Sequence, residues 1–107
     1  MQFDELKTEI KPISFVVVRA DTQDYLEVVI LKNNLDGLCA ILDRLFGSPT
    51  WPPENKIPAL AVEAIKKYGG VMSGQTLYFW NQDDFCVFAM LWPWSDGEHI
   101  TLKCGQE

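Results

Sequence analysis

The sequence predicts an α+β domain in which two helices pack on one face of a mostly antiparallel sheet of about five strands. Short runs rich in β-branched and aromatic residues lie towards both ends of the chain, separated by polar turns. Between them are two longer segments with apolar residues at helical spacing. The order is therefore ββααβββ, and 107 residues fit a single domain spanning residues 1–107.

The first two strands are predicted at residues 13–20 (ISFVVVRA) and 25–32 (YLEVVILK). The polar turn at residues 21–24 is short, so an antiparallel hairpin is their simplest pairing. Residues 1–11 form either a short helix or an ordered lead-in, which ends at Pro12. The apolar residues of that segment at roughly helical spacing are Phe3, Leu6 and Ile10.

Two amphipathic helices are predicted in the middle of the chain. Residues 35–46 carry one apolar stripe, and Gly47 is a natural stop because it tolerates the left-handed conformation. Residues 57–68 carry a second stripe, with Asn55 as a candidate N-cap and the pair at 69–70 (Gly-Gly) as the terminator.

The strands predicted at residues 76–81, 85–92 and 98–104 form an antiparallel meander with short connections. The middle strand, FCVFAMLW, is apolar on both faces, so both faces of the sheet need a cover. We expect the two central helices to cover one face. Four candidates could cover the other face: the N-terminal segment, the proline-rich connector at residues 48–53, a second copy of the chain or a ligand. A homodimer or partner interface is favoured among them.

The formal net charge of −6 disfavours binding to nucleic acids and to anionic membrane surfaces, and favours a basic protein or peptide partner. Solubility alone also accounts for such acidity. Three cysteines without CxxC spacing indicate buried thiols in a reducing compartment. Residues 1–10 do not resemble a secretory signal, and no apolar run is long enough to span a bilayer. We therefore expect a cytoplasmic protein.

Chemistry-bearing residues are sparse. His99 is the only histidine, and it is predicted to lie on the outer face of the last strand, where a solvated side chain is favoured over a general acid or base. Cys104 is the thiol with the strongest claim to a chemical role, and a structural role is favoured for it as well. The spacing of His, Cys and acidic residues predicts no metal site and no cofactor.

Aromatic residues are the best candidates for a binding surface, because Trp and Tyr bury much area at small entropic cost. Trp94 follows a strand and a proline, and Trp51 lies between prolines, so each is either exposed or a plug in the core. The candidate ligand- or partner-binding residues are Trp51, Tyr78, Trp80, Phe88, Trp92 and Trp94.

These observations favour a small acidic interaction protein, of inhibitor or immunity type, that binds another protein through an aromatic surface. One alternative is a small-molecule-binding domain with an aromatic pocket between the sheet and the proline connector. That pocket would use Trp51, Tyr78, Trp80, Phe88 and Trp92. A small enzyme using His99 or Cys104 is the third hypothesis, so catalytic activity is an open question at this point, with a non-enzyme favoured.

Overall fold

The computed structural model describes residues 2–51, 59–71, 74–82 and 84–107. It confirms the predicted class, an α+β fold with a five-stranded antiparallel sheet. The helices in the described chain are α1 (Phe3–Ile10), α2 (Leu35–Phe46) and α3 (Ala59–Ile65), with short 3-10 helices η1 (Lys32–Asn34) before α2 and η2 (Lys66–Tyr68) after α3. The strands are β1 (Val17–Asp21), β2 (Tyr25–Leu31), β3 (Thr76–Asn81), β4 (Cys86–Pro93) and β5 (His99–Gln106).

The strand order across the sheet is β1-β2-β5-β4-β3. The predicted hairpin (β1–β2) and meander (β3–β4–β5) both form, and β2 joins them by pairing with β5 along its whole length, from Tyr25 opposite Gly105 to Leu31 opposite His99. β1 and β3 are therefore the edge strands. Of the two, β3 also has Trp51 beside it, bonded to the backbone of Leu77.

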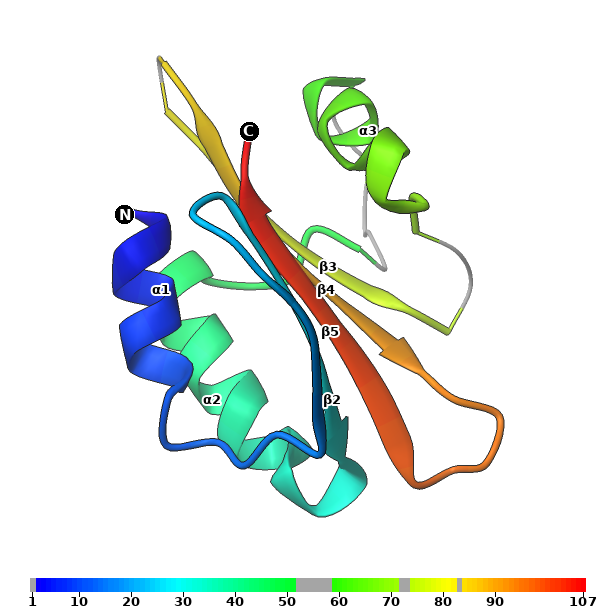
Figure 1. Cartoon of the computed structure of the whole chain (residues 1–107). Helices are drawn as coiled ribbons and strands as arrows, with labels where there is room; N and C mark the ends of the chain where they lie inside the picture. The colour runs from blue at the N-terminus through cyan, green and yellow to red at the C-terminus, as the bar shows by residue number, and fades with distance from the viewer. Residues whose placement is uncertain (1, 52–58, 72–73, 83) are drawn as a thin grey trace.

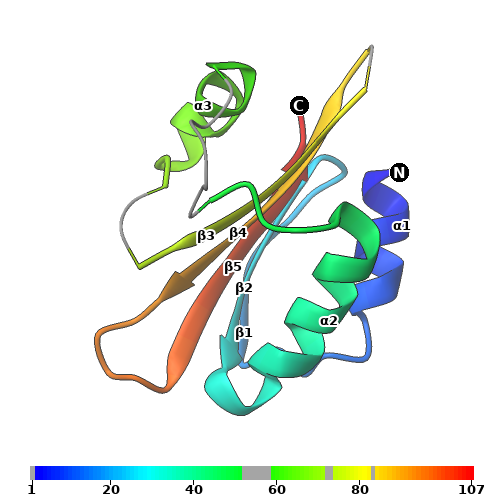
Figure 2. The ribbon, with the colours of Figure 1, turned by 180° about the vertical axis from the view of Figure 1, so that it is seen from behind.

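Helices lie on both faces of the sheet (Figure 1). Two helices, α1 and α2, pack on one face as a pair, whereas α3 stands on the opposite face, and the view from behind agrees (Figure 2). The second helix of the pair is thus the N-terminal one and not the helix predicted at residues 57–68. The apolar stripe of that segment fits either face, because β3 and β4 are apolar on both sides, so the stripe alone does not determine which face it covers.

The larger core lies between the sheet and the pair of helices. Each fully buried aliphatic or aromatic side chain there contributes about 1.5–3 kcal/mol relative to exposure. Tyr78 also lies in this core, and its hydroxyl donates to Asp43 Oδ1 at 2.7 Å, which satisfies its polar end. The buried members are Phe3, Leu6, Ile10, Leu26, Val28, Ile30, Leu38, Leu42, Tyr78, Val87, Ala89, Leu91, Ile100, Leu102 and Cys104.

A smaller core lies under α3 on the opposite face. Its buried members are Ala61, Ile65, Leu77, Phe88 and Met90. Two further rings extend it across the sheet: Tyr68 contacts Phe88 with ring centroids 4.9 Å apart, and it stacks on Tyr25 at 4.8 Å. Because α3 is short, it covers only part of this face, nearer to the β3–β4 hairpin than to the β4–β5 turn (Figure 1).

Several element boundaries differ from the prediction. β1 begins at Val17 and not at residue 13, because Ile13 and Phe15 pack against the larger core as the chain approaches the sheet. The described part of the second central helix is α-helical only over Ala59–Ile65 and then tightens into η2. The predicted cap at Asn55 and most of the proline connector lie outside the described residues. Within the described chain, no helix has the length and apolar character needed to cross a membrane.

Candidate functional site

The candidate site lies on the α3 side of the sheet, at the end next to the β4–β5 turn. In Figure 1, α3 does not extend over this part of the sheet. A row of residues crosses it, because Val17 is opposite Val29, Val29 is opposite Thr101, and Thr101 is opposite Trp92. Residues that face each other across paired strands share one face. The side chains of this row therefore all lie on the α3 side.

Trp94 folds back over β5 from the β4–β5 turn. Its indole Nε1 donates a hydrogen bond to Thr101 Oγ1 at 2.8 Å, and its ring stacks on His99 with centroids 4.7 Å apart and planes 28° apart. Its backbone N–H donates to His99 O at 2.9 Å, which continues the hairpin beyond Pro93. One hydrogen bond and one ring contact thus fix the orientation of a large, partly exposed side chain.

Arg19 of β1 reaches across towards the same tryptophan. Its guanidinium carbon is 5.4 Å from the centroid of the Trp94 ring, and one guanidinium nitrogen is 3.8 Å from a Glu27 carboxylate oxygen. Exposed contacts of either kind are worth at most about 1 kcal/mol. Their main effect is positional, since they hold Arg19 along the ring and pair its charge within the chain.

We call the resulting exposed patch the Trp94 surface. Three large apolar side chains keep much of their area in solvent, with relative exposures of 47% for Val17, 38% for Leu31 and 38% for Trp94. Leu31 is opposite His99 in the β2–β5 ladder, so it lies on the same face. Monomeric proteins expose single apolar residues routinely, but a contiguous group points to an interface. The Trp94 surface comprises Val17, Leu31, Trp94 and His99, and Asp96 and Glu98 border it.

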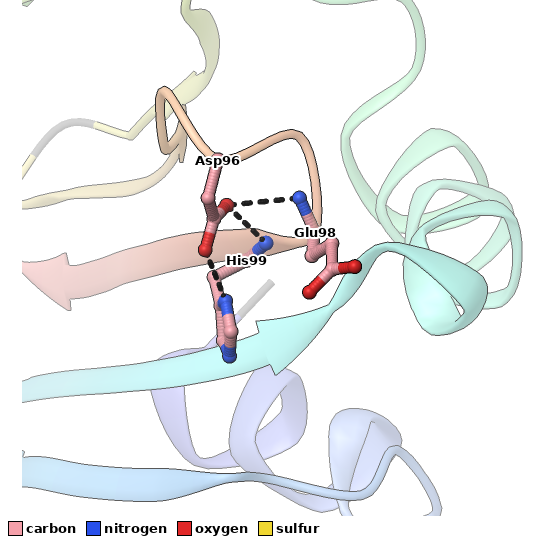
Figure 3. Close-up of side chains that lie close together, drawn as sticks. All are labelled: Asp96, Glu98 and His99. Atoms are coloured by element: carbon pink, nitrogen blue, oxygen red, sulfur yellow. Dashed lines mark hydrogen bonds and ion pairs between the residues drawn. The ribbon is translucent and has the colours of Figure 1, made fainter.

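Asp96 organises the turn at the border of this surface (Figure 3). Its Oδ1 accepts backbone N–H groups from Glu98 at 2.9 Å and from His99 at 3.0 Å, and its Oδ2 lies 2.6 Å from His99 Nδ1. The backbone N–H of Glu98, followed by the contacts with His99, lowers the pKa of the Asp96 carboxyl below its usual range. The carboxylate therefore fixes both the turn and the imidazole ring that supports Trp94.

The same three side chains could offer ligand atoms to a cation. In the described chain, one oxygen each of Asp96 and Glu98 and one ring nitrogen of His99 lie within 4.8 Å of one another. However, both Asp96 oxygens already accept hydrogen bonds from the protein. The architecture of the turn thus accounts for the clustering without a metal ion.

Two hollows flank the place where β5 begins. Lys32 and Gly97 line both of them, and Lys32 donates its backbone N–H to Glu98 O at 2.8 Å. The first hollow, of about 160 Å³, is lined by Lys32, Leu35, Pro93, Trp94, Gly97, His99 and Ile100. The second, of about 650 Å³, is lined by Leu31, Lys32, Asn33, Gly97 and Glu98. Both adjoin the Trp94 surface and could receive side chains of a partner.

Of the predicted binding residues, Trp94 lies at the centre of this surface. Trp92 is on the same face, but its ring packs against Gly69 at the end of η2. The contact is so close that a Cβ added to Gly69 would lie 2.4 Å from Trp92 Cη2. The ammonium group of Lys103 lies 3.5 Å from the centroid of the Trp92 ring. Trp92 is therefore largely covered, whereas Trp94 is accessible.

The structure does not bring the other predicted aromatic residues to this site. Tyr78 is buried on the α1–α2 side, where Trp80 also packs. Phe88 is buried on the opposite side, beneath Tyr68. Since Tyr78 and Phe88 lie on different faces of the sheet, they do not line a common pocket.

Trp51 extends the sheet beside β3. It donates its backbone N–H to Leu77 O at 3.1 Å and accepts the Leu77 N–H at 3.0 Å. Its half-buried side chain packs against the smaller core under α3. In this position it serves as a core plug, one of the two roles expected from the sequence.

The histidine and the cysteines considered from the sequence differ in burial and in hydrogen-bond partners. His99 is half-buried and oriented by a carboxylate, whereas the sequence favoured a solvated ring. Cys104 is fully buried on the α1–α2 side, and burial raises the pKa of its thiol to about 12. Burial also raises the pKa values of Cys39 and Cys86. None of these thiols has the lowered pKa that a nucleophilic cysteine requires.

Sequence reasoning missed the contributions of Val17, Leu31 and Arg19. A signal for Val17 was present, since it lies in a run of three valines in a strand that the hairpin leaves without a second neighbour. No local signal marked Arg19, whose contact with Trp94 joins residues far apart in the chain.

Comparisons of the chain with protein-family models, with curated proteins and with solved structures found no match. The fold and the site therefore define only a class, a small acidic α+β domain with an exposed tryptophan held beside its sheet.

Proposed function

We propose that this protein is a non-enzymatic binding module that recognises another protein through the Trp94 surface. The observation that carries the proposal is the position of Trp94, exposed yet fixed by Thr101 and His99. A tryptophan held in place loses little conformational freedom on binding, so more of its burial energy remains available for affinity. Exposed aromatic anchors of this kind dominate the energetics of protein interfaces.

The partner is a protein that presents basic side chains around an apolar group. Asp96 and Glu98 border the surface, and the chain carries a net charge of −6. Complementary charge speeds encounter and selects against acidic partners. An inhibitor or immunity-type protein that neutralises a basic target has this chemistry.

A cytoplasmic location fits the three free thiols, two of them buried.

Affinity capture from a lysate of the source organism tests this proposal. The bait is the parent chain, compared with Trp94→Ala and with Leu60→Ala, which removes a 54% exposed apolar side chain on α3. We expect a basic protein that the parent chain and Leu60→Ala retain, that Trp94→Ala loses, and that moderate salt elutes. If Trp94→Ala retains the same proteins in the same amounts as the parent chain, the proposal is wrong.

A small-molecule ligand is the second candidate. The hollow of about 160 Å³ beside Trp94 supports it, because Leu35, Pro93 and Trp94 contribute to a mainly apolar lining there. A fragment screen by NMR distinguishes the two functions. Fragments that shift the Trp94 indole N–H signal at submillimolar concentration would favour the ligand.

A further inference from the structure

The smaller of the two hollows beside Trp94 suits one apolar side chain of a partner. Leu35, Pro93, Trp94 and Ile100 give it a mainly apolar lining. Its volume of about 160 Å³ is below the roughly 300–1,000 Å³ of pockets that enclose a drug-sized ligand. It is close to the roughly 150 Å³ of an apolar cavity that accepts benzene. The side chain of a leucine or a phenylalanine therefore has a suitable size to enter it.

The larger hollow carries a carboxylate that the fold does not use. Glu98 lines this hollow and is exposed. Among the described residues, its side chain makes no hydrogen bond or ion pair, and in Figure 3 only its backbone N–H is joined to a neighbour. Asp96, the other acid at this border, has both oxygens engaged with protein groups. Glu98 is therefore the carboxylate that a partner can pair.

The surroundings of Glu98 favour a long basic side chain as its partner. Leu31 also lines the larger hollow, is 38% exposed and offers an apolar surface to the methylene stem of a lysine or arginine. Lys32 lines both hollows and repels such a side chain, but Asp96 and Glu98 together outweigh its single charge. The local charge is therefore negative, in keeping with the net charge of −6.

The two hollows are neighbours, since Lys32 and Gly97 line both of them. Side chains two residues apart lie on the same side of an extended segment, roughly 6.5–7 Å from each other, which suits two adjacent sites. On the basis of the proposed function, we infer that the Trp94 surface binds an extended segment of its protein partner. A large apolar residue of that segment enters the smaller hollow, and a lysine or arginine two residues away pairs with Glu98.

NMR titration of the 15N-labelled chain with capped tripeptides tests the inference. The probes are acetyl-Leu-Gly-Arg-amide and its reverse, acetyl-Arg-Gly-Leu-amide, which cover both directions of the segment. At least one should shift the Trp94 indole N–H and Glu98 amide signals, with a dissociation constant of about 1–10 mM because so small a probe makes few contacts. Replacing its arginine by glutamate, or its leucine by glycine, should weaken binding at least about threefold. The inference is wrong if neither probe shifts these signals up to about 20 mM, or if the glutamate peptide binds equally well.

Charge variants of the chain test the role of Glu98. Glu98→Gln should weaken the better probe about two- to fivefold, the range of an exposed ion pair, and Lys32→Gln should strengthen it by a similar factor. Opposite effects require a charge contact, because a purely structural role would weaken binding in both variants. Glu63→Gln on α3 is the matched control, since it is exposed, removes the same charge and should change binding less than about 1.5-fold. Equal effects of Glu98→Gln and Glu63→Gln overturn the pairing with Glu98.

These outcomes are distinguishable from those of the capture experiment. The tripeptides report on the isolated chain, whereas capture compares Trp94→Ala with the parent chain against a whole partner. Tripeptides that fail while capture depends on Trp94 overturn the extended segment and leave the Trp94 surface as the interface. Capture that does not depend on Trp94 overturns the proposed function itself.

Discussion

Trp94 stacks on His99 with ring centroids 4.7 Å apart, and Asp96 Oδ2 lies 2.6 Å from Nδ1 of the same histidine. An aspartate in a turn thus orients a histidine, and the histidine supports an exposed tryptophan. These contacts give Trp94 a fixed orientation, which a tryptophan left exposed by chance would lack.

Thr101→Val should weaken the support of Trp94 without changing the shape of the sheet. The hydroxyl of Thr101, which is 4% exposed, accepts the Trp94 Nε1 hydrogen bond at 2.8 Å. Loss of that bond should lower the free energy of unfolding by about 1 kcal/mol, as urea denaturation would measure. The Trp94 indole N–H should then exchange faster with solvent. An unchanged exchange rate would contradict the hydrogen bond.

Tyr78→Phe should cost more stability than Tyr68→Phe. Tyr78 is buried and its hydroxyl donates to the Asp43 carboxylate at 2.7 Å, so Tyr78→Phe removes a hydrogen bond to a charged group, which is worth about 1.5 kcal/mol although Asp43 itself is exposed. The Tyr68 hydroxyl donates to Glu107 at 2.9 Å in an exposed position, where water replaces it. We expect the second change to cost less than about 0.5 kcal/mol. Equal losses would show that burial of the tyrosine is not decisive.

Gly69→Ala should be strongly destabilising because two effects coincide there. Its φ is +103°, in the region that side chains rarely adopt, and an added Cβ would lie 2.4 Å from Trp92 Cη2. We expect a loss of about 2–4 kcal/mol and a change in Trp92 fluorescence. Gly97→Ala is the control, with φ +72° and open space around it, and should cost only about 1–2 kcal/mol. Similar losses for both variants would rule out the contact with Trp92.

Stability should fall as pH rises above 9. The Cys104 thiol titrates near 9.0 when unfolded, whereas burial raises its pKa to about 12 in the folded chain. Between these values only the unfolded chain loses this proton, so unfolding becomes more favourable by up to roughly 1.4 kcal/mol per pH unit.

Cys104→Ala should reduce the slope of unfolding free energy against pH in this window, measured by urea denaturation between pH 8.5 and 11. The variant also loses some stability at every pH through lost packing, so the slope is the relevant quantity. An unchanged slope would show that this thiol is not the titrating group.

Most of the elements were predictable because their patterns are local. The stripe at Leu35–Phe46 and the two-faced strand around Phe88 are visible in the sequence and form as expected. The face that α3 covers was not predictable, since β3 and β4 are apolar on both sides and one stripe fits either. The pairing of β2 with β5 joins residues about 75 positions apart, such as Val28 and Leu102, and no turn signal specifies it.

The site was predictable only in part. Trp94 was a candidate because a tryptophan after Pro93 at the end of a strand can be exposed. Its companions could not be identified, because Arg19 and Thr101 reach it through tertiary contacts that leave no spacing in the sequence. The proximity of Asp96 to His99 was visible, but the stacking of that histidine on Trp94 depends on the indole folding back over β5.

The most direct test of the central claim is the affinity of the captured partner for three chains, measured by isothermal titration calorimetry. The parent chain, Trp94→Ala and Leu60→Ala should all fold, since both side chains are largely outside the cores. Trp94→Ala should bind at least about 30-fold more weakly, equivalent to about 2 kcal/mol, whereas Leu60→Ala should bind within about twofold of the parent chain. A Trp94→Ala variant that binds as tightly as the parent chain, or a Leu60→Ala variant that loses binding instead, would contradict the assignment of the Trp94 surface as the interface.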